Sequence, residues 1–176
     1  MAFEVSVLPG LPAYGEPATV FSATGLGTHS EGLVVSFCMR DSPPWIGNFV
    51  RGLTKFDYVA VHPNRVAALI VAGGQGYVID PVARQLQSTI GGAIVDAFAH
   101  PTTTAIVLNH QNLSFESIGA YGRLWRSRQI SWDGLRFVEV TGNALSGEAW
   151  RYDDTWHPFQ LDLVSGAVRG GAYKEG

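Results

Sequence analysis

The sequence has a single cysteine and few charged residues. Among 176 residues only Cys38 is a cysteine, so no disulfide can form among these residues, and zinc sites built mainly from cysteine are excluded. Charged residues make up 15% and hydrophobic residues 46%, a balance that buries enough apolar surface to fold. The formal net charge of -3 disfavours a broad attraction to nucleic acid or to anionic lipid.

Long hydrophobic runs are also missing. No stretch of about 18 apolar residues occurs, and the first residues lack the basic and apolar regions of a signal peptide. We therefore expect a soluble, cytoplasmic protein that makes no membrane contact. The length is close to that of one ordinary domain, and we predict a single all-β domain over residues 1–176.

Short β-branched and aromatic segments fill the chain, separated by Gly and Pro, and this pattern is typical of strands. One segment, 45–53, instead predicts a short helix, because it follows two prolines. Cys38 lies among Val34, Val35 and Phe37, so we expect a thiol buried in a strand. The predicted strands are 3–7, 18–22, 33–38, 57–61, 66–72, 76–80, 95–99, 103–109, 114–118, 124–130, 135–141, 144–150 and 158–163.

A faint internal repeat runs through these strands. The tripeptide Val61-His62-Pro63 recurs 38 residues later as Ala99-His100-Pro101. At the same offset Ala67 matches Ala105, Tyr77 matches Phe115 and Leu86 matches Leu124, and a looser third copy places residues 159–162 opposite 77–80. Repeats of about 40 residues made of strands are typical of stacked antiparallel sheets, of which β-propeller blades are one kind.

Two segments resemble the outer hairpin of a propeller blade, where a strand ends at Asp and a small turn leads to an edge strand. They are 79–84 and 161–166. Blades of about 40 to 45 residues allow only about four in this length, so we predict all-β antiparallel sheets in a small or incomplete β-propeller-like fold, or a twisted β-sandwich. Exposed strand edges in such a fold would favour a homodimer, and a second copy could complete the propeller.

The segment Gln-Ile-Ser-Trp-Asp-Gly at 129–134 resembles one shared by small uncharacterised bacterial proteins. This resemblance implies a bacterial protein and brings no activity with it. The pair Trp132-Asp133 occurs only once, so the WD-repeat family is not indicated.

Three histidines, His62, His100 and His157, each precede a proline, which favours an extended backbone at the histidine. Two explanations are open: they meet at one corner of neighbouring repeats, or each is a neutral imidazole whose hydrogen bond holds the start of a strand. No His-x-His pair or His-Glu-x-x-His motif is present. We predict no metal and no cofactor.

Basic and aromatic residues alternate near residue 126. Arg123, Arg126 and Arg128 form a basic cluster that is interleaved with Trp125 and close to Trp132 and Asp133. On a strand Arg126 and Arg128 would share one face and Trp125 the other, which predicts a binding face for a protein partner. The alternative is a solvated sheet face whose arginines pair with Glu116, Glu139 or Glu148.

A second candidate site lies at the polar loop before Trp156. Asp153, Asp154, Trp156 and His157 could present a ring and polar groups to a carbohydrate or another small ligand, although core packing also explains a tryptophan. Adjacent carboxylates on an extended chain point to opposite faces, so we predict a turn at Asp153-Asp154 rather than paired catalytic acids.

Taken together, these patterns predict a non-enzymatic protein-interaction domain of the immunity or adaptor kind, with a protein partner. The alternative is a carbohydrate or small-ligand binding module using Trp132, Trp156 and His157. A hydrolase using Asp153, Asp154 and His157 is the least favoured hypothesis, and we assign no catalytic residue.

Overall fold

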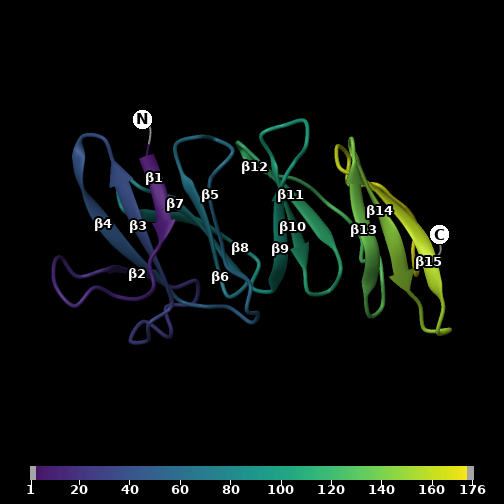
Figure 1. Ribbon diagram of the computed structural model, residues 1–176, viewed down its shortest axis with the longest axis horizontal. Helices are drawn as coiled ribbons and strands as arrows, with labels where there is room; N and C mark the ends of the chain where they lie inside the picture. The colour runs from purple at the N-terminus through teal and green to yellow at the C-terminus, as the bar shows by residue number, and fades with distance from the viewer. Residues whose placement is uncertain (1–2, 174–176) are drawn as a thin grey trace. The chain divides into compact units, whose positions relative to one another are not determined.

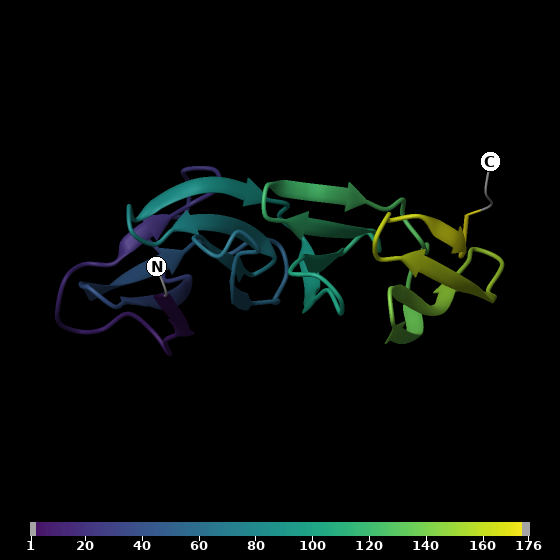
Figure 2. The ribbon, with the colours of Figure 1, turned by 90° about the horizontal axis from the view of Figure 1, so that it is seen from above.

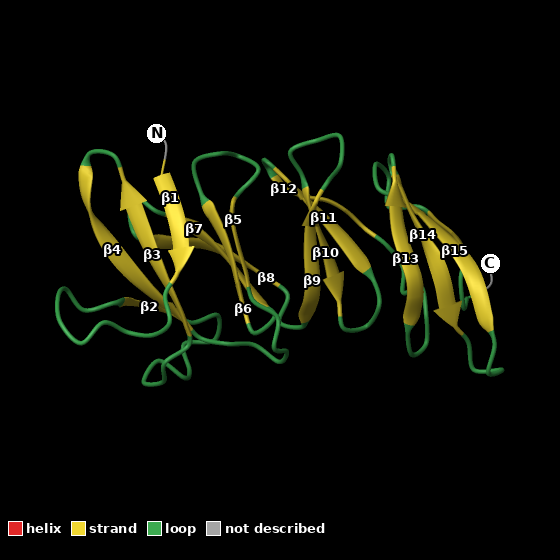
Figure 3. Cartoon of the chain, viewed as in Figure 1, coloured by secondary structure: helices red, strands yellow, loops and turns green. Residues whose placement is uncertain are grey.

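Strands and loops make up the whole described chain (Figure 1, Figure 3). A computed structural model describes residues 3–173, which form sixteen strands in four four-stranded sheets. No helix capable of crossing a membrane occurs among these residues. The predicted all-β fold built from repeated antiparallel units is confirmed.

Each sheet takes its strands from one stretch of sequence. Sheet A contains β1 (Phe3–Val7), β2 (Thr19–Phe21), β3 (Leu33–Met39) and β4 (Ser42–Phe49). Sheet B contains β5 (Tyr58–Val61), β6 (Ala68–Ala72), β7 (Gln75–Asp80) and β8 (Gln85–Ile90). Sheet C contains β9 (Ile94–Ala99), β10 (Ile106–His110), β11 (Phe115–Gly119) and β12 (Gly122–Arg126). Sheet D contains β13 (Leu135–Thr141), β14 (Ala144–Trp150), β15 (Trp156–Asp162) and β16 (Val168–Gly170).

The chain divides into two compact units between Val95 and Asp96. Sheets A and B belong to the first unit, and sheet D with nearly all of sheet C belongs to the second. That residues 1–176 act as one domain stays a prediction.

Sheets B, C and D are simple antiparallel meanders, in which each strand pairs with the next one along the chain. Sheet A differs, because its order is β1-β3-β4-β2 and β2 runs parallel to β4. Each sheet carries the twist usual for antiparallel strands, which the turned view makes visible (Figure 2).

The repeat found in the sequence corresponds to repeated structure. His62 N–H donates to the Ala67 carbonyl at 2.9 Å, and His100 N–H donates to the Ala105 carbonyl at 2.8 Å. The histidine and alanine that recur 38 residues apart therefore close the same backbone loop in sheets B and C.

The turns after β7 and β15 have the predicted form. Asp80 Oδ1 accepts from the N–H groups of Val82 and Ala83, both at 2.9 Å. Asp162 Oδ1 accepts from Val164 at 2.7 Å and from Ser165 at 3.2 Å. Each aspartate thus ends a strand and fixes the turn that leads to the last strand of its sheet.

One apolar core lies within each unit. The first joins sheets A and B, and all five side chains of β6 are buried, as the unbroken apolar run Ala68–Ala72 predicts. Its buried members are Phe21, Leu33, Val35, Phe37, Trp45, Phe49, Ala68, Ile70, Ala72, Tyr77 and Ile79. The second joins sheets C and D through Val107, Phe115, Trp125, Ile130, Leu145, Ala149, Phe159, Leu161 and Leu163.

A buried tryptophan links the two sheets of each unit. In the first unit Trp45 Nε1 donates to the Pro81 carbonyl at 2.9 Å, and in the second Trp125 Nε1 donates to the Leu163 carbonyl at 3.0 Å. Both acceptors are the residue directly after the aspartate of the turn just described. The same polar contact therefore joins neighbouring sheets twice.

The predicted helix at 45–53 is wrong, because β4 occupies Ser42–Phe49. Trp45, Gly47 and Phe49 alternate toward the core, and Gly47 is needed there, since a Cβ atom would lie 2.6 Å from the Phe49 ring. The expectation of a buried thiol is also wrong. Cys38 lies in β3 but is exposed, because Phe37 takes the core side and Cys38 pairs with Glu4 on the outer side.

The two linking tryptophans give a stability test. In Trp45→Phe the Pro81 carbonyl loses its indole donor, and we expect the free energy of unfolding to fall by about 1–3 kcal/mol in urea denaturation. In Trp125→Phe we expect a loss of only about 1 kcal/mol, because His100 Nε2 also lies 3.1 Å from the Leu163 carbonyl. The control is Trp132→Phe at an exposed ring, with a change within about 0.5 kcal/mol. Equal stability of all three variants would contradict a stabilising role of the two indole hydrogen bonds between sheets.

Candidate functional site

Most of the predicted site residues meet at one end of sheet D. They come from the loop before β13, from the turn between β14 and β15, and from the start of β15. The residues brought together are Trp132, Asp133, Asp153, Asp154, Trp156 and His157. Trp125 and Arg126 lie on β12 of sheet C, and Arg128 follows that strand.

Three aromatic rings pack together at this end. The ring of Trp132, 53% exposed, stacks on Tyr173 with centroids 5.7 Å apart and planes 15° apart. Tyr152, 74% exposed, meets the edge of Trp132 at 5.8 Å. Exposed aromatic rings fixed by one another are typical of binding surfaces, because little side-chain entropy remains to be lost on binding.

A second aromatic group lies on β14 and β15 of the same sheet. Trp150 and Trp156 are paired across β14 and β15, with ring centroids 5.1 Å apart. The Arg136 guanidinium lies 4.2 Å from the centre of the Trp156 ring, and its Nε donates to Glu148 at 2.6 Å. We call the two groups together the aromatic surface: Trp132, Arg136, Trp150, Tyr152, Trp156 and Tyr173.

Arginine side chains fasten the segments that carry these rings. Arg128 donates to the carbonyls of Gly170, at 2.9 Å, and Tyr173, at 3.3 Å. Arg151 Nε donates to the Ala172 carbonyl at 3.1 Å. Both guanidinium groups hold the segment that positions Tyr173, so Arg128 stabilises this surface.

The predicted single face of Arg126 and Arg128 is not formed. β12 ends at Arg126, and Arg128 turns away to the carbonyls just named. Trp125 is buried in the core, whereas Arg126 is exposed and paired in register with Glu116. The structure therefore places these three residues in three different environments.

Glu116 is a buried carboxylate beneath the arginines of sheet C. His110 Nε2 lies 3.0 Å from its Oε2, and Arg123 lies 3.7 Å from its Oε1. Burial raises the pKa of Glu116, but the hydrogen bond from His110 and the positive charges of His110, Arg123 and Arg126 outweigh burial, so its pKa is lowered. The alternative prediction, in which arginines of a solvated sheet face pair with Glu116, holds for Arg123.

The polar turn before Trp156 joins an acid, a hydroxyl and an imidazole. The Thr155 hydroxyl contacts Asp153 Oδ1 and lies 2.6 Å from His157 Nε2. The Thr155 hydrogen bond lowers the pKa of Asp153, which disfavours Asp153 as a general acid. Asp154 has a φ of 59° and its N–H donates to the Arg151 carbonyl at 3.1 Å, so the two aspartates form the predicted turn.

The histidines before proline hold strand ends. Thr102 N–H donates to His100 Nδ1 at 3.2 Å, which leaves the proton on Nε2 to donate to the Leu163 carbonyl. Asn64 N–H donates to His62 Nδ1 at 3.3 Å, and burial lowers the pKa of His62. Within residues 3–173, no three His, Cys, Asp or Glu side chains are grouped so that they could hold a metal ion.

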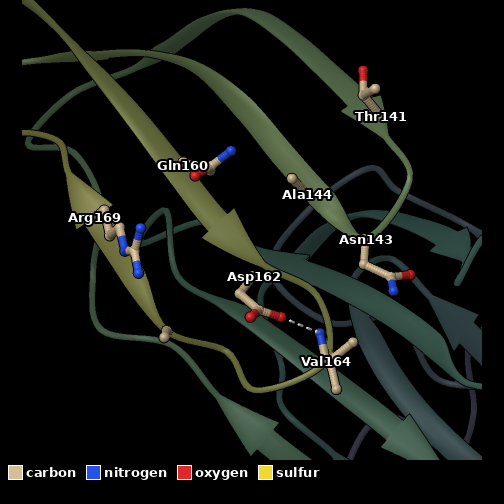
Figure 4. A pocket seen from close by; sticks show the side chains of 8 residues that line it. Thr141, Asn143, Ala144, Gln160, Asp162, Val164 and Arg169 are labelled. Carbon is tan, nitrogen blue, oxygen red and sulfur yellow. Dashed lines mark hydrogen bonds between the residues drawn. The ribbon is translucent and has the colours of Figure 1, made fainter.

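A groove of about 380 Å³, lined by both polar and small apolar side chains, lies on the face of sheet D that points away from the core (Figure 4). Asn143 Oδ1 accepts from the Thr102 hydroxyl at 2.7 Å, and Asp162 is fixed by its turn, so both side chains are held in place. The lining residues are Thr141, Asn143, Ala144, Gln160, Asp162, Val164, Ala167 and Arg169.

Fold and surface together define an all-β protein of repeated four-stranded sheets whose last sheet carries a partly exposed aromatic surface and a groove. A scan against protein-family models and a search of curated proteins each found no match.

Glu116 makes stability depend on pH with a defined sign. Its pKa is lower folded than unfolded, so the charged form adds stability that is complete above the ordinary pKa of 4.5 and is lost as the pH falls through the lowered value. We expect Glu116→Gln to lose about 1–3 kcal/mol of unfolding free energy near neutral pH. In urea denaturation, the gap to wild type should close as the pH falls through the lowered pKa of Glu116. Asp96→Asn, at an exposed position of sheet C, is the control, and a gap independent of pH would contradict the assignment.

Proposed function

We propose that this chain is a non-enzymatic protein-interaction domain of the immunity or adaptor kind, which recognises a protein partner through the aromatic surface of sheet D. The observation that carries the proposal is the group of Trp and Tyr rings at one end of one sheet, of which Trp132 and Tyr152 are exposed and the others half-buried, together with Arg136. Trp, Tyr and Arg are the residues that most often dominate the binding energy of protein interfaces.

Preorganisation supports this proposal. Trp132 stacks on Tyr173, Arg136 is held by Glu148, and Arg128 and Arg151 fix the segment that carries Tyr173. A partner that docks here would meet rings already in place, and the entropy lost on binding would be small. The side chains of Asp153 and Thr155 at the border supply a polar rim.

Capture of a protein partner and alanine variants of the aromatic surface test this proposal. We expect a tagged chain to recover one protein from the lysate of its source cells at a fixed ratio. Trp132→Ala and Tyr152→Ala should each weaken its binding by about thirtyfold or more, measured by calorimetry with the purified partner. Val82→Ala, at an exposed apolar residue of sheet B, should bind as wild type does. Unchanged affinity in both aromatic variants would remove the aromatic surface from consideration.

A second candidate function is the binding of a carbohydrate, and the groove favours it. Gln160, Asp162 and Arg169 offer donors and acceptors with equal positive and negative charge, which suits the hydroxyl groups of a neutral sugar. Ala144 and Ala167 leave room between these long side chains. Trp156 lies on the same face of β15 as Gln160, and could stack on the next sugar ring along.

The carbohydrate candidate is tested by titrating cellohexaose, xylohexaose and chitohexaose into labelled protein. Side-chain amides of Asn143 and Gln160 report on the groove in an amide correlation spectrum. We expect their signals to shift and the shifts to disappear in Arg169→Met, but to persist in the control Arg123→Met on sheet C. Unmoved signals with all three sugars would count against the candidate, and shifts confined to Trp132 and Tyr152 would move the sugar to the aromatic surface.

A further inference from the structure

The first strand of sheet D has an unusual surface for an edge strand. β13 pairs on one side only, and every residue after Leu135 is exposed. Three of them are large apolar residues: Phe137 is 77% exposed, Val138 46% and Val140 41%. An exposed apolar strip on an unpaired edge is a site where another chain can associate.

Phe137 is also strained. Its φ is 52°, a left-handed backbone conformation that bulky side chains rarely adopt. The strain arises at a β-bulge, where Phe137 and Val138 stand opposite the single residue Gly147. A side chain at Gly147 would clash with the Arg136 carbonyl at 2.9 Å and with the Phe159 ring at 3.0 Å. The chain thus holds an aromatic residue in solvent at a cost in strain, which points to a use for that residue.

The bulge also changes the charge pattern of β13. Arg136 pairs with Glu148 and Glu139 pairs with Ser146, and Glu148 and Ser146 lie on one face of β14. Residues three apart would face opposite sides of a regular strand, but the extra residue puts Arg136 and Glu139 on the same face. The exposed edge of β13 therefore presents, in chain order, a positive charge, two exposed apolar residues opposite Gly147, and then a negative charge.

This order is self-complementary. When two copies of β13 lie antiparallel about a two-fold axis between Phe137 and Val138, Arg136 of each copy meets Glu139 of the other. Phe137 of each copy then lies against Val138 of the other. In a parallel arrangement the like charges would meet instead, which costs energy.

We infer that β13 is a self-association surface whose occupant is β13 of a second copy of this chain, in an antiparallel, two-fold arrangement. The contact is made by side chains, because the bulge interrupts the straight row of backbone groups that a continuous sheet needs. Arg136 keeps its Nε bond to Glu148 and uses its terminal amino groups toward the second copy. This inference does not rest on the proposed function, with which it shares only Arg136.

Charge reversal tests the inference with the protein alone. In sedimentation velocity we expect the wild type to form a dimer as its concentration is raised, whereas Glu139→Arg and Arg136→Glu should each weaken the dimer at least about tenfold. Mixing these two variants should restore the dimer, because each positive pair of one copy then faces a negative pair of the other. Wild type that stays monomeric at every concentration, or mixed variants that stay apart, would overturn the inference.

A glycine variant separates this role from folding. Glycine adopts a φ of 52° without strain, so Phe137→Gly should unfold at a higher temperature than wild type and yet dimerise at least about tenfold more weakly. Val164→Ser, which removes an exposed apolar residue elsewhere on sheet D, should leave the dimer unchanged. A dimer of wild-type strength in Phe137→Gly would overturn the inference. If the wild type forms the dimer but captures no protein partner, that result would count against the proposed function alone.

Discussion

The hydrogen bond from a buried indole to a turn carbonyl is the contact on which the arrangement of sheets within each unit depends. Apolar burial holds two sheets together but has no direction, so by itself it leaves their relative position loosely defined. Trp45 and Trp125 supply the direction, since each donates to the carbonyl of one residue in the neighbouring sheet. Asp80 and Asp162 fix the turns that carry those carbonyls. Core and turn therefore stabilise each other, and a buried carbonyl without a donor would be costly.

Much of this fold could be predicted from local sequence pattern. All thirteen predicted strands overlap strands of the structure, and the bounds of β1, β13 and β14 agree. The repeat of His62 at His100 and of Asp80 at Asp162 correctly predicted shared backbone loops and turns. These features are local, because a histidine before proline or an aspartate at a strand end acts on residues within its own loop.

The failures came where tertiary packing overrides local preference. β8 and β16 are edge strands of mostly polar or small residues, so no hydrophobic alternation marked them. β4 has two prolines directly after its first residue and contains Gly47, and only the packing of Trp45 and Phe49 in the core makes it a strand. Alternation also gave the two faces around Trp125 without telling which face is buried.

The candidate site was also predictable only where local sequence pattern decides it. Trp132 and Trp156 could be chosen because exposed tryptophans near polar loops often bind ligands. Tyr173 could not, because Arg128 and Arg151 bring it to Trp132 through hydrogen bonds to main-chain carbonyls. Phe137 could not either, since its exposure follows from the bulge opposite Gly147.

Comparison of the sheets separates the residues of the fold from those of recognition. Sheet B closes its central hairpin with the two-residue turn between Ala72 and Gln75, whereas sheet D has five residues between Trp150 and Trp156. The strand-ending aspartate and the buried tryptophan link are present in both units, but the aromatic surface belongs to the longer hairpin of sheet D and to the loops around it. A repeated scaffold can change such loops without disturbing its core, because they contribute little to packing. Sheet D therefore combines the repeated meander with loops that carry the aromatic surface, and a specific activity is best sought there.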